Sequence, residues 1–217
     1  MNSIPFRTAR DVRDACPQVA AHLAADRVLA YPTETVYGLG CRPTAAAVAA
    51  LIRIKGRKPG KPFLLLIAGV SMAERLDLVF NDAARAMADA FWPGPLTLVL
   101  PGAESTLPDS LRGPEGGVAV RWTSHAGIAR LLDYLGYPIT STSANRPGSS
   151  PAPGAGGVLE TFKADVASGQ LMVLDGGVLG NVPSSTLIDC TGRVPVLIRE
   201  GAIRRAELHA KVGSLAP

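Results

Sequence analysis

Polar side chains that could bind a ligand follow short apolar stretches at four places in this sequence. The first place is the run PTETVYG, in which Thr33, Thr35 and Tyr37 come directly after the apolar stretch 28–31. Hydroxyls there are well placed for a ligand, because open α/β sheets bind ligands at the ends of their strands. Threonine and proline also favour turns, so a capped turn beside a core tyrosine explains the same residues.

Four cations within seven residues form the second place, namely Lys55, Arg57, Lys58 and Lys61. Three of the chain's five lysines are among them, whereas its 17 arginines are scattered. A solvated basic helix end is one explanation, since cations interact favourably with the C-terminal end of a helix dipole. The other is an anion, because like charges at this density repel one another unless a group such as a triphosphate joins them.

Small polar residues and arginines occupy the remaining two places. The third is the segment 141–145, STSAN, whose hydroxyls and amide could form a strand-end turn or bond a nucleotide. The fourth consists of the segment 184–186, SST, and Arg199, which ends an apolar stretch. Arg121 ends another apolar stretch in the same way. An arginine at a strand end is commonly a surface ion pair, but it becomes a ligand where other members of an anion site are present. The four places together describe an anion-binding concavity lined by hydroxyls.

The familiar catalytic and nucleotide-binding motifs do not occur in the sequence. GRKPGKP resembles a phosphate loop, but its glycines are too close and proline follows the lysine where Ser or Thr would hold magnesium. GLGCRP lacks the third glycine of a dinucleotide fingerprint, and there is no HExxH or GxSxG. The three histidines are far apart along the chain. Neither a covalent nucleophile nor a metal held by the protein is therefore expected.

The composition predicts a globular protein of the cytoplasm. The chain has 217 residues, 47% of them hydrophobic and 18% charged, and its net charge of +4 is too small to indicate a nucleic-acid partner. Its longest apolar run, Phe63 to Val70, is far shorter than the roughly 20 residues that cross a bilayer. Cys16, Cys41 and Cys190 lie too far apart for a disulfide framework or a metal knuckle, and no apolar signal segment opens the sequence.

Alternating helical and strand patterns must position the four places. Apolar residues at helical spacing, with capping residues such as Thr8, Thr44 and Asn81, predict helices at 8–27, 44–56, 81–91, 125–134 and 158–166 and a short terminal helix. Apolar runs predict strands at 28–31, 63–67, 96–100, 117–121, 138–141, 171–174, 185–189 and 194–198, and VYGLGC at 36–41 is predicted to be extended chain. This order predicts an α/β fold, and the strand-rich final third favours a mixed sheet. No linker divides the chain, so one domain over residues 1–217 is expected.

Six sequence motifs in a fixed order resemble the YrdC family, and within it the enzymes that form threonylcarbamoyl-AMP. They are YPTETVYGLGC, IKGRKPGKPF, FWPGPLTLVLP, VAVR, STSAN and SSTLID, the last followed by REG, and they span residues 28–201. One such motif is weak, but six in order are specific. The resemblance implies a single YrdC-like catalytic domain without a C-terminal second domain. Its fold would be a twisted mixed sheet that is flanked by helices and has a basic concave face.

The resemblance also implies a reaction and its substrates. L-Threonine, bicarbonate and ATP would combine into threonylcarbamoyl-AMP with release of pyrophosphate, for the threonylcarbamoyladenosine modification of tRNA. ATP would enter as a substrate with Mg²⁺, without a metal held by the protein. A downstream threonylcarbamoyl transferase complex is the expected partner, together with weak tRNA binding and no membrane contact. Catalysis would consist of positioning and charge neutralisation, because the carbamate oxygen attacks the α-phosphate in line.

The family motifs imply roles for individual residues of this sequence. Threonine binding falls to Thr33, Tyr37, Arg121, Ser141 and Ser185. ATP binding falls to Lys55, Arg57, Lys58, Ser143, Asn145, Ser150 and Arg199. Lys55, Arg57 and Arg199 are expected to carry the catalysis.

The sequence departs from the family pattern at two positions. Lys58 stands where the family usually has proline, and Pro151 stands where a further ligand serine is expected, so Ser150 is the proposed substitute. With no second domain to close the site, the loop 146–157 would gate it. Two alternatives remain open. One is a non-catalytic RNA-binding module with the same basic concavity, and the other is a nucleotide-binding paralogue that makes a different carbamoyl product.

Overall fold

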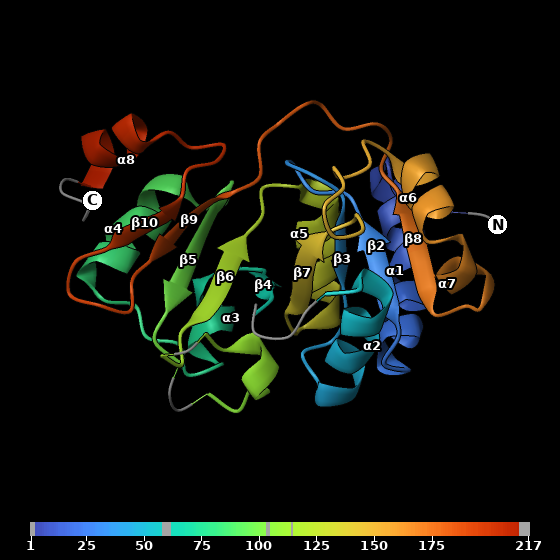
Figure 1. Ribbon diagram of the computed structural model, residues 1–217, viewed down its shortest axis with the longest axis horizontal. Coiled ribbons are helices and arrows are strands. Elements are labelled where there is room, and N and C mark those ends of the chain that lie inside the picture. Colours follow the sequence, from blue (N-terminus) through green and yellow to red (C-terminus); the bar gives the residue numbers. More distant parts are fainter. Residues whose placement is uncertain (1–2, 58–61, 103–104, 114, 213–217) are drawn as a thin grey trace.

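The structure is a computed structural model that describes residues 3–57, 62–102, 105–113 and 115–212. Within these ranges ten strands form one sheet in the order β1–β8–β2–β3–β7–β4–β6–β5–β9–β10 (Figure 1). The strands are β1 (Ile4–Pro5), β2 (Val28–Tyr31), β3 (Gly38–Gly40), β4 (Leu64–Ile67), β5 (Leu96–Leu100), β6 (Val118–Trp122), β7 (Ile139–Ser143), β8 (Leu171–Asp175), β9 (Thr186–Asp189) and β10 (Val196–Arg199). Four neighbouring pairs are parallel and five are antiparallel, so the predicted mixed sheet is confirmed.

Helices flank this sheet, as predicted, but they cover its two halves unequally. They are α1 (Ala9–Ala24), α2 (Ala45–Lys55), α3 (Val70–Glu74), α4 (Asp82–Phe91), α5 (Ala126–Leu135), α6 (Ala155–Thr161), α7 (Lys163–Ala167) and α8 (Arg205–Val212), with a 3₁₀ turn η1 (Asp109–Leu111). In the half around β2 and β8, α1 and α5 pack on one face and α2, α6 and α7 on the other. In the half around β5, α3, α4 and α8 belong to the core on one face. No helix of the described residues is both long and apolar enough to cross a membrane.

Capping residues explain where the first two long helices begin and end. Thr8 and Asp11 form a reciprocal capping box at the start of α1, and the helix continues through Pro17 instead of stopping there. Thr44 caps α2 by accepting a hydrogen bond from a backbone N–H of the first turn. Gly56 ends α2 in the left-handed region at φ 67°, which a residue with a side chain rarely adopts. This turn directs the following basic segment away from the helix axis.

Two predicted elements were wrong in extent. The helix expected at 158–166 is two helices, α6 and α7, because Phe162 between them adopts a non-helical conformation and is fully buried. The strand expected at 194–198 begins only after Pro195, a residue that has no N–H for the sheet. The structure thus shortens an edge strand and breaks a helix where single residues override the periodic pattern.

Other boundaries differ in ways that affect the site more directly. The first helix ends three residues before the predicted position 27, and Asp26 takes a positive φ of 54°. β7 runs on to Ser143, so the first hydroxyls of STSAN belong to the strand and pair with β3. The elements β1, α3 and η1 were not predicted, because segments of two to five residues carry too little periodicity.

The alternation of side chains along β5 separates the core from an open face. Leu96, Leu98 and Leu100 are fully buried in the core shared with α3 and α4. Thr97 and Val99 point to the opposite face, where they line a cavity. Because side chains alternate along a strand, the same cavity receives one side of β6 and of β9. The open face of this half of the sheet is therefore the floor of the candidate site.

Candidate active site

A cavity of about 1380 Å³ lies over the open face of β5, β6 and β9 and extends to β3, β4 and β7. Pockets for one small molecule usually measure about 300–1,000 Å³, so this one has room for more than one substrate. Its upper wall includes residues 150–153 and part of the segment 176–185, which we call the strap. The strap connects β8 to β9 and crosses from one half of the sheet to the other (Figure 1).

Thr33 forms a turn and also lines the cavity. Its hydroxyl donates a hydrogen bond to Val36 O at 2.7 Å and accepts one from each of the N–H groups of Thr35 and Val36, at 3.2 Å. The Thr35 hydroxyl lies 3.0 Å from Thr33 Oγ1 and accepts a hydrogen bond from Arg121 Nη1 at 3.2 Å. The run PTETVYG is therefore a hydroxyl-capped turn whose side chains reach an arginine 86 residues away.

Arg121 is a buried arginine whose charge is compensated from behind the cavity. It is 4% exposed, and its Nε donates to Gly94 O at 3.2 Å. Its Nη2 lies 2.6 Å from Glu34 Oε1, and Thr123 donates a short hydrogen bond to the other oxygen of Glu34. Burial alone would raise the pKa of Glu34, but the Arg121 charge and these hydrogen bonds outweigh it and lower the pKa. Arg121 is thus held in one orientation beside an ionised carboxylate.

Lys55 does not face the cavity and instead holds the loop that follows β7. It is 6% exposed, and its ammonium group lies 2.7 Å from Ser143 O, 2.6 Å from Asn145 O and 2.8 Å from Asn145 Oδ1. Burial, with the charges of Arg57 and Arg146, lowers the pKa of Lys55 to about 8. Oxygens of Ser143 and Asn145 therefore accept hydrogen bonds from the Lys55 ammonium group and offset its repulsion by the neighbouring cations.

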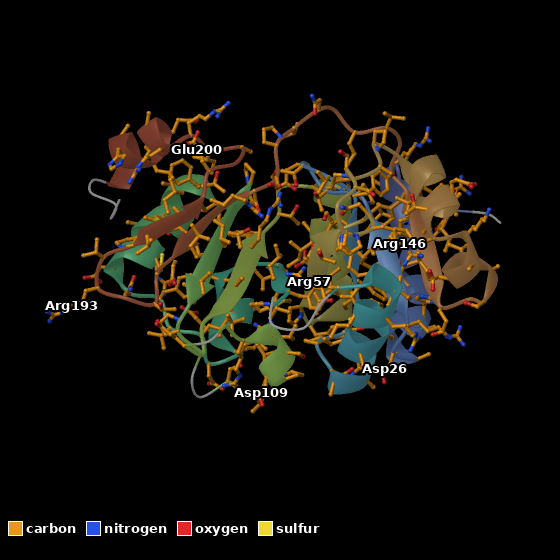
Figure 2. The ribbon with its side chains drawn as sticks, in the orientation of Figure 1. Asp26, Arg57, Asp109, Arg146, Arg193 and Glu200 are labelled. Carbon is orange, nitrogen blue, oxygen red and sulfur yellow. The ribbon has the colours of Figure 1, made fainter. Side chains whose placement is uncertain are left out.

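Arg57 and Arg199 both line the cavity and are held by hydrogen bonds, Arg57 to one hydroxyl and one carbonyl oxygen and Arg199 to a carbonyl oxygen. Arg57 donates from Nη1 to Thr142 Oγ1 and from Nη2 to Pro62 O, each at 3.1 Å. Its Nε is buried without a hydrogen-bond partner among the described residues. Figure 2 shows Arg57 near the middle of the molecule. Arg199 donates to Ser185 O from Nε and Nη2, at 3.3 and 2.9 Å.

Tyr37 lies in the core and supports the strap instead of lining the cavity. Its hydroxyl donates to Gly177 O at 2.9 Å and accepts from the Gly176 N–H at 3.0 Å. Both partners belong to the first residues of the strap. The predicted core tyrosine is thus present, and its hydroxyl connects the PTETVYG turn to the upper wall of the cavity.

The structure brings most of the predicted site residues to one cavity. Nine of them line it: Thr33, Arg57, Arg121, Ser141, Ser143, Asn145, Ser150, Ser185 and Arg199. Lys55 and Tyr37 lie behind its walls. The predictions for Lys58 and the fourth cation Lys61 fall outside the described residues. Arginines from three distant parts of the chain therefore share a concave surface lined by hydroxyls.

Three residues near the site were not singled out from the sequence. Glu34 lies inside the first motif, but nothing in the sequence pairs it with Arg121, 87 residues away. Thr97 is a single hydroxyl in the apolar strand LTLVL, a signal that could have been used. Arg146 anchors the loop after β7 by donating to Ile54 O and by stacking on Phe162. These contacts join segments that local patterns cannot relate.

This arrangement suits the binding of anions and the positioning of reactants. Arginines at a desolvated surface bind carboxylate or phosphate strongly, and hydroxyls add orientation. Among the described residues there is no group of three or more His, Cys, Asp or Glu side chains that could hold a metal ion. Cys16, Cys41 and Cys190 are buried and unpaired. Charge neutralisation by fixed arginines is the chemistry that these side chains can supply.

Known proteins of similar sequence and structure share this arrangement of elements. The family model Sua5_yciO_yrdC, described as "Telomere recombination", matches residues 21–201. A threonylcarbamoyl-AMP synthase of Thiobacillus denitrificans is 40% identical over 189 residues, which cover 86% of this chain and 97% of that protein. The crystal structure of Pyrococcus abyssi Sua5 complexed with L-threonine superposes with a TM-score of 0.87 at 33% identity.

The relatives differ in length. The superposition covers 99% of this chain but 62% of the Pyrococcus abyssi structure. A threonylcarbamoyl-AMP synthase of Bacillus subtilis is 34% identical over 199 residues, which are 91% of this chain and 56% of that protein. The chain thus spans a little over half of these longer relatives and nearly all of the one from Thiobacillus denitrificans. With the family model matching most of its residues, the chain belongs to the Sua5/YciO/YrdC family.

Proposed function

We propose that this chain is a threonylcarbamoyl-AMP synthase that converts L-threonine, bicarbonate and ATP into threonylcarbamoyl-AMP, pyrophosphate and water. One observation carries the proposal: a single cavity contains a buried arginine surrounded by hydroxyls and two further arginines, Arg57 bonded to β7 and Arg199 at the end of β10. The names of the relatives from Thiobacillus denitrificans and Bacillus subtilis support it. We further propose that residues 1–217 act as one catalytic domain.

The amino acid would bind at Arg121. With Nε bonded to Gly94 and one contact each for Nη1 and Nη2, the guanidinium retains N–H groups for a carboxylate. Thr33, Ser141 and Ser185 line the same cavity and supply hydroxyls around that position. Tyr37 would act on this site through the strap. An amino-acid site is supported by the Pyrococcus abyssi relative, whose crystal structure is a complex with L-threonine.

ATP would bind at the side of the cavity formed by the basic segment and the loop after β7. Arg57 and Arg199 are proposed to hold the phosphates, with Lys58 as a further ligand from outside the described residues. Ser143, Asn145 and Ser150 line the cavity and would contact the nucleotide. Lys55 would position Asn145 for this role, because three of its contacts are made to oxygens of Ser143 and Asn145.

The chemistry would proceed in two steps that these side chains support by position and charge. The threonine amino group attacks the carbon of bicarbonate, and loss of water leaves a carbamate. A carbamate oxygen then forms a bond to the α-phosphorus of ATP while the bond from that phosphorus to the bridging oxygen breaks, and pyrophosphate leaves with the electron pair. Fixed arginines offset the negative charge that develops on the phosphate oxygens. ATP would enter as its magnesium complex, with Mg²⁺ bound to phosphate oxygens.

The product would serve threonylcarbamoyladenosine modification of tRNA. A mixed anhydride of this kind hydrolyses readily, so a transferase complex that accepts it is the proposed partner. Weak binding of tRNA to the basic concave face is also proposed. We place the protein in the cytoplasm, because its three cysteines are unpaired, as expected for a reducing compartment.

The test is to incubate the purified chain with ATP, Mg²⁺, bicarbonate and L-threonine and to measure pyrophosphate. Release should require threonine, and Ser143→Ala and Asn145→Ala should each weaken ATP binding. A non-catalytic RNA-binding module would instead release no threonine-dependent pyrophosphate. It would keep its salt-dependent RNA affinity in both variants. A paralogue with another product would respond to other amino acids in place of threonine.

A further inference from the structure

Thr97 is a polar side chain in an otherwise apolar strand. It lies in β5 between Leu96 and Leu98, both fully buried in the core, and its own side chain points to the cavity. Thr97 is 1% exposed. A hydroxyl at a buried strand position needs a hydrogen-bond partner, because leaving it unpaired costs free energy. The role of the Thr97 hydroxyl therefore depends on which group it bonds to.

The partner of Thr97 is the hydroxyl of Ser185, which is itself only 3% exposed. The two oxygens are 2.8 Å apart. Two hydroxyls have two protons, and one proton lies in the bond between them. Among the described residues neither hydroxyl has another side-chain hydrogen bond, so the pair retains one O–H donor and several lone pairs. We call Thr97 and Ser185 the hydroxyl pair.

The backbone around Ser185 is already fixed by other contacts. Its carbonyl oxygen accepts two N–H groups of Arg199, and the next residue, Thr186, bonds to the backbone at Gly201 and Ile203. The remaining freedom at Ser185 is rotation of its hydroxyl. Thr97 restricts that rotation, so it determines in which direction the Ser185 hydroxyl can bind a ligand.

The hydroxyl pair lies beside Arg121 on the same face of the sheet. β5 and β6 are antiparallel, with Leu98 opposite Val120, and continuing this register by one residue places Thr97 opposite Arg121. Directly opposed residues of such a pair have Cβ atoms about 5 Å apart. Thr97, Ser185 and Arg121 also line one cavity, so a ligand with its carboxylate on the Arg121 guanidinium can reach the hydroxyl pair with its other polar groups.

In threonine, the carbon that bears the β-hydroxyl is two carbon–carbon bonds from the carboxylate carbon. It donates one hydrogen bond and accepts others, which complements a pair that offers one donor and several lone pairs. We propose that Thr97, through its bond to Ser185, is a specificity-determining residue that selects an amino acid with a β-hydroxyl. This inference rests on the proposed function, because it assumes that the amino acid binds at Arg121.

The test compares Thr97→Val, which keeps the shape but removes the hydroxyl, with Thr97→Ser, which keeps the hydroxyl. L-Valine serves as the matched ligand, because it has a methyl group where threonine has its hydroxyl. Thr161→Val is the control variant, since Thr161 is an exposed helical residue whose hydroxyl donates to Gly157 O within α6. The KM for threonine and the KM for ATP are measured in the adenylate assay. Threonine binding is measured by calorimetry, and stability by thermal unfolding.

For Thr97→Val we expect the KM and Kd for threonine to rise roughly 5- to 10-fold, the loss expected for one hydrogen bond. The KM for ATP, kcat and weak valine binding should stay within about twofold, and Thr97→Ser should remain close to the wild-type protein. Ser185→Ala should raise the KM and Kd for threonine to a similar degree. The double variant that also carries Thr97→Val should show no further rise, because the two hydroxyls act as one unit.

Unchanged threonine binding in Thr97→Val would overturn the inference. An equal loss of affinity for threonine, valine and ATP would also overturn it, because such a loss indicates a merely structural role. If Thr97→Val does not fold, Ser185→Ala decides, since it must also lower the preference for threonine over valine. Failure of the proposed function is a separate outcome: the wild-type chain would form no threonine-dependent adenylate. Calorimetry would then still show whether the hydroxyl pair selects threonine over valine.

Discussion

Replacing Lys55 with methionine tests whether this residue supports the nucleotide side of the cavity. Methionine has a similar length but no charge, so it fills the same space at the end of α2. The Lys55 ammonium group has three protons, and its three shortest contacts, at 2.6 to 2.8 Å, are to oxygens of Ser143 and Asn145. Lys55→Met leaves these oxygens without their charged donor.

The expected loss of stability follows from these contacts. An unsatisfied buried acceptor costs about 1–3 kcal/mol, but Ser143 and Asn145 are half-buried, so water can replace part of the lost bonding. The substitution also removes the unfavourable burial of an ammonium group. We therefore expect the free energy of unfolding to fall by about 2 kcal/mol. Because Asn145 lines the cavity, the KM for ATP should rise about tenfold or more.

The pH dependence gives a second and independent signature. The fold lowers the pKa of Lys55 from 10.5 to about 8. Between these two values the unfolded chain keeps a proton that the folded chain has lost, so this group makes stability rise as pH rises from about 8 to 10.5. Loss of the same proton removes a donor from the loop, so kcat/KM for ATP should fall above pH 8. Stability and activity thus move in opposite directions.

The assay is urea unfolding and steady-state kinetics of both proteins between pH 7 and 10. Lys163→Met is the control, because Lys163 is exposed and its ammonium group lies 3.7 Å from a carboxylate oxygen of Glu160. The control should match the wild-type protein in stability, in KM and in its pH profile. The supporting role of Lys55 is refuted if Lys55→Met unfolds like the control and keeps the wild-type KM for ATP.

Two further substitutions examine the walls of the cavity. Glu34→Gln removes the charge beside Arg121 and should lower stability by about 2 kcal/mol at neutral pH, measured by denaturant unfolding. The fold lowers the pKa of Glu34, so the stability that its charge contributes is fully present above pH 4.5 and is lost as pH falls through the lower folded value. The wild-type protein should therefore lose more stability on acidification than Glu34→Gln. An equal fall of stability with pH in the two proteins would contradict this. Tyr37→Phe removes both hydrogen bonds to the start of the strap and should speed amide hydrogen exchange there. Unchanged exchange, with a higher KM for threonine alone, would indicate a direct contact with the amino acid instead.

Much of the fold could be predicted because its determinants are local. Thr44 and Gly56 delimit α2 through hydrogen bonds within a few residues, and the apolar run at 96–100 is β5 with the predicted bounds. One boundary that was wrong depends on tertiary packing, because Phe162 is buried between two short helices. Membership of the predicted family is confirmed by the family model, which matches residues 21–201.

The site was predictable in its residues but less so in their partners. Hydroxyls and cations after apolar stretches marked Arg57, Arg121 and Arg199, and all three line one cavity. What each side chain contacts depends on segments about 90 residues apart, as for Lys55 with Asn145. No local pattern encodes the hydrogen bonds that join the end of α2 to this loop.

The central claim is tested most directly by following the carbon of bicarbonate into the product. The chain is incubated with ATP, Mg²⁺, L-threonine and ¹³C-labelled bicarbonate, and the nucleotides are analysed at once by mass spectrometry. We predict threonylcarbamoyl-AMP that is one mass unit heavier than the unlabelled compound, formed with an equal amount of pyrophosphate and only when threonine is present. Unlabelled adenylate, or pyrophosphate release that does not require threonine, would contradict it.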